Sequence, residues 1–233
     1  MPDILAITDP SGSSFLQQLI ETSNKQADNV SARLREKLAA FGPHAELRRL
    51  DLFPDQVGRS LASEVRVADL FVGTRPYGDP AKGERIEEAV LFRSGRGCLF
   101  LPPKVTRAAK LDTVVIGWKN TREAARAVAA AIPLLQLATN VDVIMVSEGD
   151  GSLGLEHGVD IGKYLSRHGV TSEIRTVPGA PDTAEALQRE AHASGADLIV
   201  MGAYGHSRLQ EFVLGGATRD VLKNSAIPVF MAH

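Results

Sequence analysis

Four glycines near the C-terminal end of the sequence have the spacing of a loop that holds an anion. Gly202 and Gly205 are separated by two residues, and Gly215 and Gly216 follow after nine more. Gly202 ends an apolar run typical of a buried strand, and Gly216 begins a helical pattern. We expect Gly202 and Gly205 to let the backbone turn sharply and approach a ligand closely.

The helix predicted after the second glycine pair would complete this anion site. Amides of a first helical turn have no acceptor inside the helix, and the helix dipole is positive at that end. These amides belong to Gly215, Gly216, Ala217 and Thr218. His206 and Arg208 lie in the loop and would either contact the anion or be solvated. Lys119, after another predicted strand, would add a cation at the same edge of the sheet, beside the loop.

Short apolar runs alternate with helical patterns through the second half of the chain, which predicts a parallel sheet flanked by helices. The predicted strands are residues 113–118, 141–147, 171–177, 197–202 and 227–232. Asn120, with Glu123 three residues later, is the expected cap of the first helix. Pro133 is expected to kink or break that helix where it ends.

Three ordered matches between the two halves indicate an internal duplication. Residues 45–48 resemble 172–175, residues 68–72 resemble 196–200, and residues 98–101 align with 228–231, at offsets of 127, 128 and 130. The alternative is that any two strand–helix–strand units look alike at this level, but the ordered offsets favour duplication. The predicted domains are therefore residues 1–103 and 112–233, joined by a proline-led linker at 104–111.

The first half has one predicted strand–helix unit fewer than the second. Its predicted strands are residues 4–8, 45–50, 69–72 and 98–101. The helical stretch at 15–41 has a polar middle at 22–29, which leaves open one helix or two. Since unpaired sheet edges are normally covered, the last strands of the two halves are expected to lie together in an internal pseudo-dimer. A homodimer of the whole chain also stays open.

The glycine spacing resembles the nucleotide-binding signature of universal stress proteins, G-x2-G-x9-G followed by Ser or Thr. The resemblance continues through Thr218 to the run Ile227-Pro228-Val229, and Trp118 with residues 121–127 resembles the first strand–helix junction of tandem members. It implies an α/β fold of two tandem, open parallel-sheet domains of Rossmann-like type. It also implies ATP or a related adenine nucleotide at the C-terminal loop, with Mg²⁺ or Mn²⁺.

The chain departs from this signature in three places. Gly216 stands where the family has Ser or Thr, and Lys119 stands where nucleotide-binding members have an acid that helps to hold adenosine. In the first half Asp9 matches that acid, but Thr74 and Tyr77 replace the first two loop glycines. We therefore expect no nucleotide in the first half.

Composition and the remaining residues exclude several other functions. A net charge of −2 argues against nucleic acid as a partner, and no apolar run is long enough to span a membrane. The single cysteine, Cys98, is expected in the core and permits no intrachain disulfide, which favours a cytoplasmic location. The six histidines show no metal-ligand spacing, so no metal site is predicted.

Three functions remain after these exclusions. The favoured one is a regulatory stress-response module that binds ATP, and the second is a protein that acts through protein contacts without a ligand. A slow ATP hydrolase ranks last, because the sequence has no Walker motif and no catalytic triad or carboxylate pair that can be placed in one cleft. No catalytic residue is therefore assigned.

Overall fold

The computed structural model describes residues 10–76, 86–103, 111–147, 154–178, 182–203 and 216–233. The chain forms two compact units, Met1–Leu52 and Phe53–His233. The sequence-based boundary at 104–111 falls inside the second unit, between two strands of one sheet. Among the described helices, none is long and apolar enough to cross a membrane.

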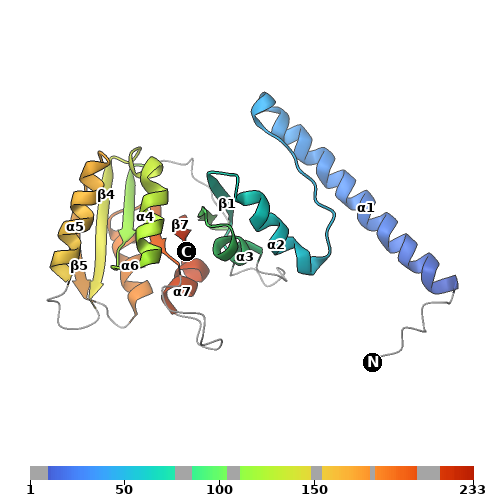
Figure 1. Ribbon diagram of the computed structural model, residues 1–233. Coiled ribbons are helices and arrows are strands. Elements are labelled where there is room, and N and C mark those ends of the chain that lie inside the picture. The colour runs from blue at the N-terminus through green and yellow to red at the C-terminus, as the bar shows by residue number, and fades with distance from the viewer. Residues whose placement is uncertain (1–9, 77–85, 104–110, 148–153, 179–181, 204–215) are drawn as a thin grey trace. The chain divides into compact units, whose positions relative to one another are not determined.

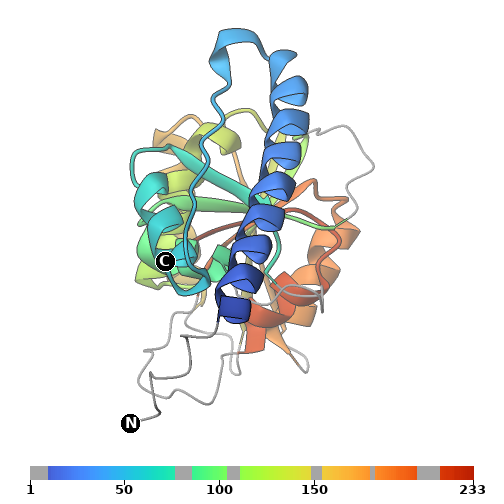
Figure 2. The same cartoon turned by 90° about the vertical axis from the view of Figure 1, so that its right-hand side faces the viewer.

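The first unit consists of helix α1 (Pro10–Ala39), the short 3-10 helix η2 (Gly42–His44) and an extended segment that returns alongside α1 (Figures 1 and 2). α1 is one continuous helix, so its polar middle introduces no break. Arg49 on the returning segment donates to Asp28 of α1 at 2.6 Å. Residues 4–8, predicted to form a strand, lie outside the described part.

The strand predicted at residues 45–50 is wrong. Ala45 and Leu47 are half-buried and alternate with exposed residues, which is the period that suggested a strand. However, no strand pairs with this segment in the described part of the chain. Its arginines instead form side-chain pairs, Arg48 with Glu46 and Arg49 with Asp51. Alternation alone therefore misidentified an extended segment that has no sheet to join.

The second unit is built on a seven-stranded sheet in the order β1-β2-β7-β6-β3-β4-β5 (Figure 1). The strands are β1 (Leu70–Thr74), β2 (Gly97–Leu101), β3 (Thr113–Gly117), β4 (Asn140–Ser147), β5 (Glu173–Pro178), β6 (Leu198–Gly202) and β7 (Val229–Ala232). All neighbours are parallel except β2 and β7, which are antiparallel. The predicted α/β fold is confirmed, and the five strands of the second half lie where the sequence indicated.

Helices cover both faces of this sheet. They are α2 (Pro54–Val65), α3 (Ile86–Arg93), α4 (Arg122–Leu135), α5 (Gly154–Arg167), α6 (Thr183–Ala193) and α7 (Gly216–Asn224). One core cluster joins α2, α3, α6 and α7 to one face, and a second joins α4 and α5 to the other. Val115 and Ile116 show the alternation, since these adjacent buried residues belong to opposite clusters.

Helix α4 differs in detail from its prediction. Thr121, rather than Asn120, is the cap, and its side chain accepts a hydrogen bond from the amide of Ala124 at 3.3 Å. Pro133 lies within the helix, which continues to Leu135. The proline is exposed and close to the helix end, so the hydrogen bond that it removes lies on the solvent side of the last turn.

The last strands of the two halves pair with each other, as expected. Leu99 of β2 lies opposite Phe230 of β7 in an antiparallel ladder that also joins Cys98 to Met231 and Phe100 to Val229. This ladder turns two small sheets into one continuous sheet. Neither β2 nor β7 is therefore left as an open edge.

Matching hydrogen bonds lie on either side of this ladder, in α2-β1-α3-β2 and in α6-β6-α7-β7, as a duplication would produce. The amide of Arg75 donates to Leu101 O at 3.0 Å, and the amide of Ala203 donates to Ala232 O at 3.0 Å. After α3, Ser94 Oγ accepts from the amide of Arg96 at 3.2 Å. After α7, Ser225 Oγ accepts from the amide of Ile227 at 3.1 Å.

Candidate functional site

The strand order of the second half reverses between β3 and β6. From β3 the chain proceeds to β4 on one side, whereas β6 and β7 lie on the other. In open α/β sheets, ligands bind at the carboxyl ends of the strands at such a switch point. Gly117 pairs with Met201, so the residues that follow each of them leave the sheet side by side. These are Trp118 and Lys119 after β3, and Gly202 and Ala203 at the end of β6.

Gly202 has a packing role that the sequence did not reveal. A Cβ at Gly202 would lie 2.5 Å from the Ala124 amide nitrogen and 2.7 Å from the Glu123 carbonyl carbon. Both atoms are backbone, so they cannot move aside without shifting α4. The φ angle of Gly202 is not positive. Among the described residues, the close neighbour of this glycine is therefore the first turn of α4.

The first turn of α7 lies at the same edge of the sheet, because a helix that connects two parallel strands runs antiparallel to them. Gly216 and Ala217 begin the helix, followed by the buried Thr218, and no acidic residue occupies the first turn. Amides at this end lack intrahelical acceptors. Gly205, His206, Arg208 and Gly215, which were assigned to the same site, lie outside the described residues.

Lys119 lies exposed at the end of β3, at the switch point, as its place in the sequence indicated. The register of β3 and β6 brings its backbone next to the end of β6. Of the predicted site residues that the structure describes, Lys119 and Gly202 thus lie at the ends of two paired strands. Gly216, Ala217 and Thr218 approach the same edge through α7.

Asp220 is a residue near the site that sequence reasoning missed. A Cβ at Gly216 would lie 3.2 Å from Asp220 Oδ2, so this carboxylate folds back over the start of α7. The signal available in the sequence was the spacing of four residues between Gly216 and Asp220, which places both on one face of a helix. A carboxylate here opposes a bare anion but suits a divalent cation that accompanies one.

Glu123 is a second residue that was missed as part of the site's electrostatics. It is buried, and its carboxylate accepts from Arg122 at 2.8 Å. Burial acts to raise the pKa of Glu123, but its own backbone amide, Arg122 and the nearby His233 together lower the pKa below its ordinary value. Glu123 is therefore an ionised, paired carboxylate beside Gly202, which does not suit a general base.

His233 ties the end of β7 to the same edge. Its Nδ1 lies 3.1 Å from the Ala203 carbonyl oxygen, so this nitrogen carries the proton that it donates. Arg126 of α4 donates to the His233 carbonyl oxygen at 3.0 Å. The histidine ring also contacts Phe92 of α3 edge-to-face, with ring centroids 4.8 Å apart.

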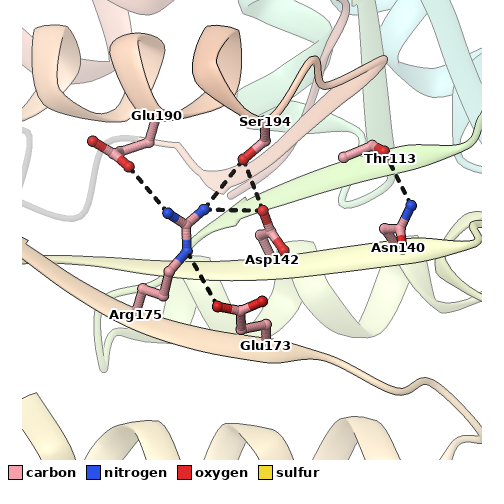
Figure 3. Close-up of polar contacts among 7 residues, drawn as sticks. All are labelled: Thr113, Asn140, Asp142, Glu173, Arg175, Glu190 and Ser194. Carbon is pink, nitrogen blue, oxygen red and sulfur yellow. Dashed lines mark hydrogen bonds and ion pairs between the residues drawn. The ribbon is translucent and has the colours of Figure 1, made fainter.

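A separate polar cluster lies near the amino ends of β4 and β5, away from this edge (Figure 3). Arg175 of β5 donates to Asp142 of β4 at 3.0 Å, and to Glu190 and Ser194 of α6 and the turn after it at 3.3 and 3.2 Å. Ser194 Oγ donates to Asp142 at 2.8 Å. These side chains pair with one another across two strands and a helix, which identifies a packing network, and Arg175 Nε is left buried without a hydrogen-bond partner. In the described part of the chain, no three His, Cys, Asp or Glu residues are placed to hold a metal.

Helix α3, which corresponds to α7 in the first half, begins with acidic residues. α3 carries Glu87 and Glu88 in its first turn, and Thr74 Oγ1 at the end of β1 donates to Glu87 at 3.4 Å. The segment from Arg75 to Leu101 is three residues shorter than the corresponding segment from Ala203 to Ala232. A shorter segment and two acids both disfavour an anion at α3.

The segment that contains the α7 site matches a known family. Residues 155–233, from α5 to the end of β7, match the Universal stress protein family. This match covers about a third of the chain. The chain is 37% identical over 67 residues to "Universal stress protein Slr1230" of Synechocystis, a match that covers 29% of this chain and 23% of that one.

A second relative and two solved structures extend the comparison. "Universal stress protein MJ0577" of Methanocaldococcus jannaschii is 35% identical over 72 residues, which cover 31% of this chain and 43% of the relative. The matches thus span less than half the length of these curated relatives. A universal stress protein from Archaeoglobus fulgidus superposes with a TM-score of 0.72 at 20% identity, covering 91% of this chain and 78% of that one.

The second structure is a putative universal stress protein from Pseudomonas aeruginosa. It gives a TM-score of 0.57 at 16% identity, over 86% of this chain and 77% of that one. At these identities the likeness shows the fold alone.

Proposed function

We propose that this chain is a universal stress protein and binds one adenine nucleotide, ATP, at the switch point between β3 and β6, as a regulatory module. The observation that carries the proposal is the start of α7. This helix begins at the carboxyl edge of the sheet, has no acid in its first turn, and lies inside the segment that matches the family. Such a helix end stabilises phosphate through its amides and its dipole.

Each residue of the proposed site has a distinct role. The amides of Gly215, Gly216, Ala217 and Thr218 hold the phosphates, and Gly205 lets the loop pass close to them. Lys119 supplies a cation from the end of β3. His206 and Arg208 add loop contacts to phosphate. Asp220 would hold Mg²⁺ or Mn²⁺ carried by the nucleotide, since carboxylate oxygens are ligands that such hard cations prefer.

A second candidate function is a ligand-free interaction protein, again within the family. It is favoured by the Asp220 carboxylate over the start of α7 and by the lack of a hydroxyl at Gly216. We propose no enzyme activity, because the buried acid at this edge, Glu123, is paired with Arg122. We place either function in the cytoplasm, because Cys98 is the only cysteine in the sequence and no intrachain disulfide is possible.

Calorimetric titration of ATP with Mg²⁺ into the parent chain and Gly205→Val tests the nucleotide site. The parent should bind, and Gly205→Val should weaken binding at least about tenfold, because a branched side chain obstructs close approach of the backbone to phosphate. Far-UV circular dichroism verifies that the variant is folded. Equal affinity in the two proteins, or no binding by the folded parent at millimolar ATP, would favour the ligand-free function.

The same titration with Lys119→Asp separates two roles for the lysine. If Lys119 pairs with phosphate, the reversed charge weakens ATP binding. If the lysine replaces the acid that usually holds the adenosine end, the substitution restores that acid and tightens binding. The proposed role is the first, so tighter binding by Lys119→Asp would move Lys119 away from the phosphates.

A further inference from the structure

The far end of α7 is held by a residue from the other half of the chain. Arg75 follows β1, and its Nη1 donates to the Ser225 carbonyl oxygen at 2.8 Å. Ser225 is the residue directly after α7 and is 3% exposed. This carbonyl is one of the helix-end acceptors that have no partner inside the helix. Arg75 therefore completes the C-terminal end of the helix whose N-terminal end forms the proposed site.

The setting of Arg75 is unusual for an arginine. The residue is half-buried, and its Nε is buried without a hydrogen-bond partner. None of the ion pairs among the described residues includes Arg75. A guanidinium withdrawn from water without a counter-ion is unfavourable unless something else compensates. The negative end of the α7 dipole, which Nη1 contacts directly, provides that compensation.

The contact has no counterpart in the opposite direction. Arg75 corresponds to Ala203 in the duplicated unit, since their amides make the matching bonds to Leu101 and Ala232. Alanine has no side chain that could reach the end of α3. The first half therefore supports a helix of the second half, without a matching contact in return. The backbone of Arg75 is itself held by the hydrogen bond from its amide to Leu101 of β2.

We propose that Arg75 is a positioning residue that fixes α7 for nucleotide binding. The first half of the chain would thereby support the nucleotide site of the second half. The inference rests on the proposed function for its effect on ATP. A cation at one end of a helix and an anion at the other both act on the same dipole. A helix held in place before binding loses less freedom when the phosphates arrive, which raises affinity.

The test compares Arg75→Met with Arg66→Met. Methionine keeps much of the side-chain stem but removes the charge and the donors. Arg66 is a matched control, because its Nη2 donates at 3.2 Å to the carbonyl of Arg93, the last residue of α3. The same chemistry is thus removed from the helix that lacks the proposed site. Arg75→Lys returns a cation to the helix end.

Two measurements are made on each protein: amide hydrogen exchange over residues 216–224 without nucleotide, and calorimetric titration of ATP. Arg75→Met should speed exchange in α7 and weaken ATP binding, each by about three- to tenfold. Arg66→Met should leave both unchanged, and Arg75→Lys should recover part of both effects. Melting by circular dichroism verifies folding, and Arg75→Lys is compared with the parent if Arg75→Met is unfolded.

The outcomes separate this inference from the proposed function. The positioning role would be overturned if Arg75→Met left amide hydrogen exchange in α7 at the parent rate, or if Arg66→Met increased that rate equally. This holds whatever the affinity for ATP. Faster exchange with unchanged ATP affinity would overturn the effect on the site. A parent that binds no ATP would refute the proposed function and this effect on affinity, while exchange would still decide whether Arg75 holds α7.

Discussion

Gly202 shows that a glycine of a signature can be required for the packing of the fold. The sequence places it in a loop-forming pattern, whereas the structure places it against the backbone of Glu123 and Ala124. Bringing α4 this close fixes where Lys119 and the cap Thr121 lie. The glycine thus acts on the site through the position of a helix. The role of Gly202 is therefore tested by the effect of a substitution on stability.

Gly202→Ala is expected to lower the free energy of unfolding by about 1–3 kcal/mol, because the added methyl group overpacks a rigid backbone contact. Gly216→Ala is the matched control. Among the described residues, its Cβ would approach only the end of the Asp220 side chain, which can turn away. We expect that variant to change stability by no more than about 0.5 kcal/mol. Urea unfolding followed by circular dichroism measures both, and equal stability of the two variants would contradict the packing role.

At the scale of elements, ion pairs fix helix α6 to the outer strands. Arg175 on β5 bridges Asp142 of β4 to Glu190 of α6, and Ser194 closes the network (Figure 3). Asp142 and Glu190 are each largely buried, with side chains 17% and 18% exposed. Helix α6 also places Leu187 against Gly117 at the end of β3. The network therefore helps to position the helix that packs against the switch point.

Asp142→Ala should destabilise the second unit by about 1–3 kcal/mol, since it leaves the partly buried Arg175 and Ser194 without their common acceptor. The matched control is Glu173→Ala. Glu173 is mostly exposed and approaches Arg175 only at 3.9 Å, so its loss should cost about 0–1 kcal/mol. Thermal and urea unfolding of both variants decides the matter. A smaller loss in Asp142→Ala than in Glu173→Ala would show that the network carries little stability.

Much of the second half could be predicted from sequence because local pattern and tertiary structure agree there. Four of its five strands are mostly buried apolar runs, the edge strand β5 is only partly buried, and each strand pairs with a neighbour. Helices α4 and α6 begin with side-chain caps. The segment at 45–50 had the alternation but no neighbouring strand, and sequence pattern contains no information on pairing partners. Asp220 and the packing role of Gly202 were missed for a related reason, since their neighbours depend on helix packing.

At the scale of the molecule, the two similar units differ in their roles. The last strands of the two units, β2 and β7, pair with each other and join both units into one sheet. The second copy is the longer one and has no acidic residue in the first turn of its helix α7, whereas the first turn of α3 contains Glu87 and Glu88. The account therefore predicts one nucleotide for each chain, and assigns the first copy a supporting role through Arg75.

Native mass spectrometry of the freshly purified chain tests this central claim most directly. The account predicts added mass equal to one adenine nucleotide, lost on denaturation, and no more than one when ATP and Mg²⁺ are supplied at millimolar concentration. A folded chain that stays free of nucleotide under those conditions would contradict nucleotide binding. Two nucleotides on each chain would contradict the division of roles between the halves.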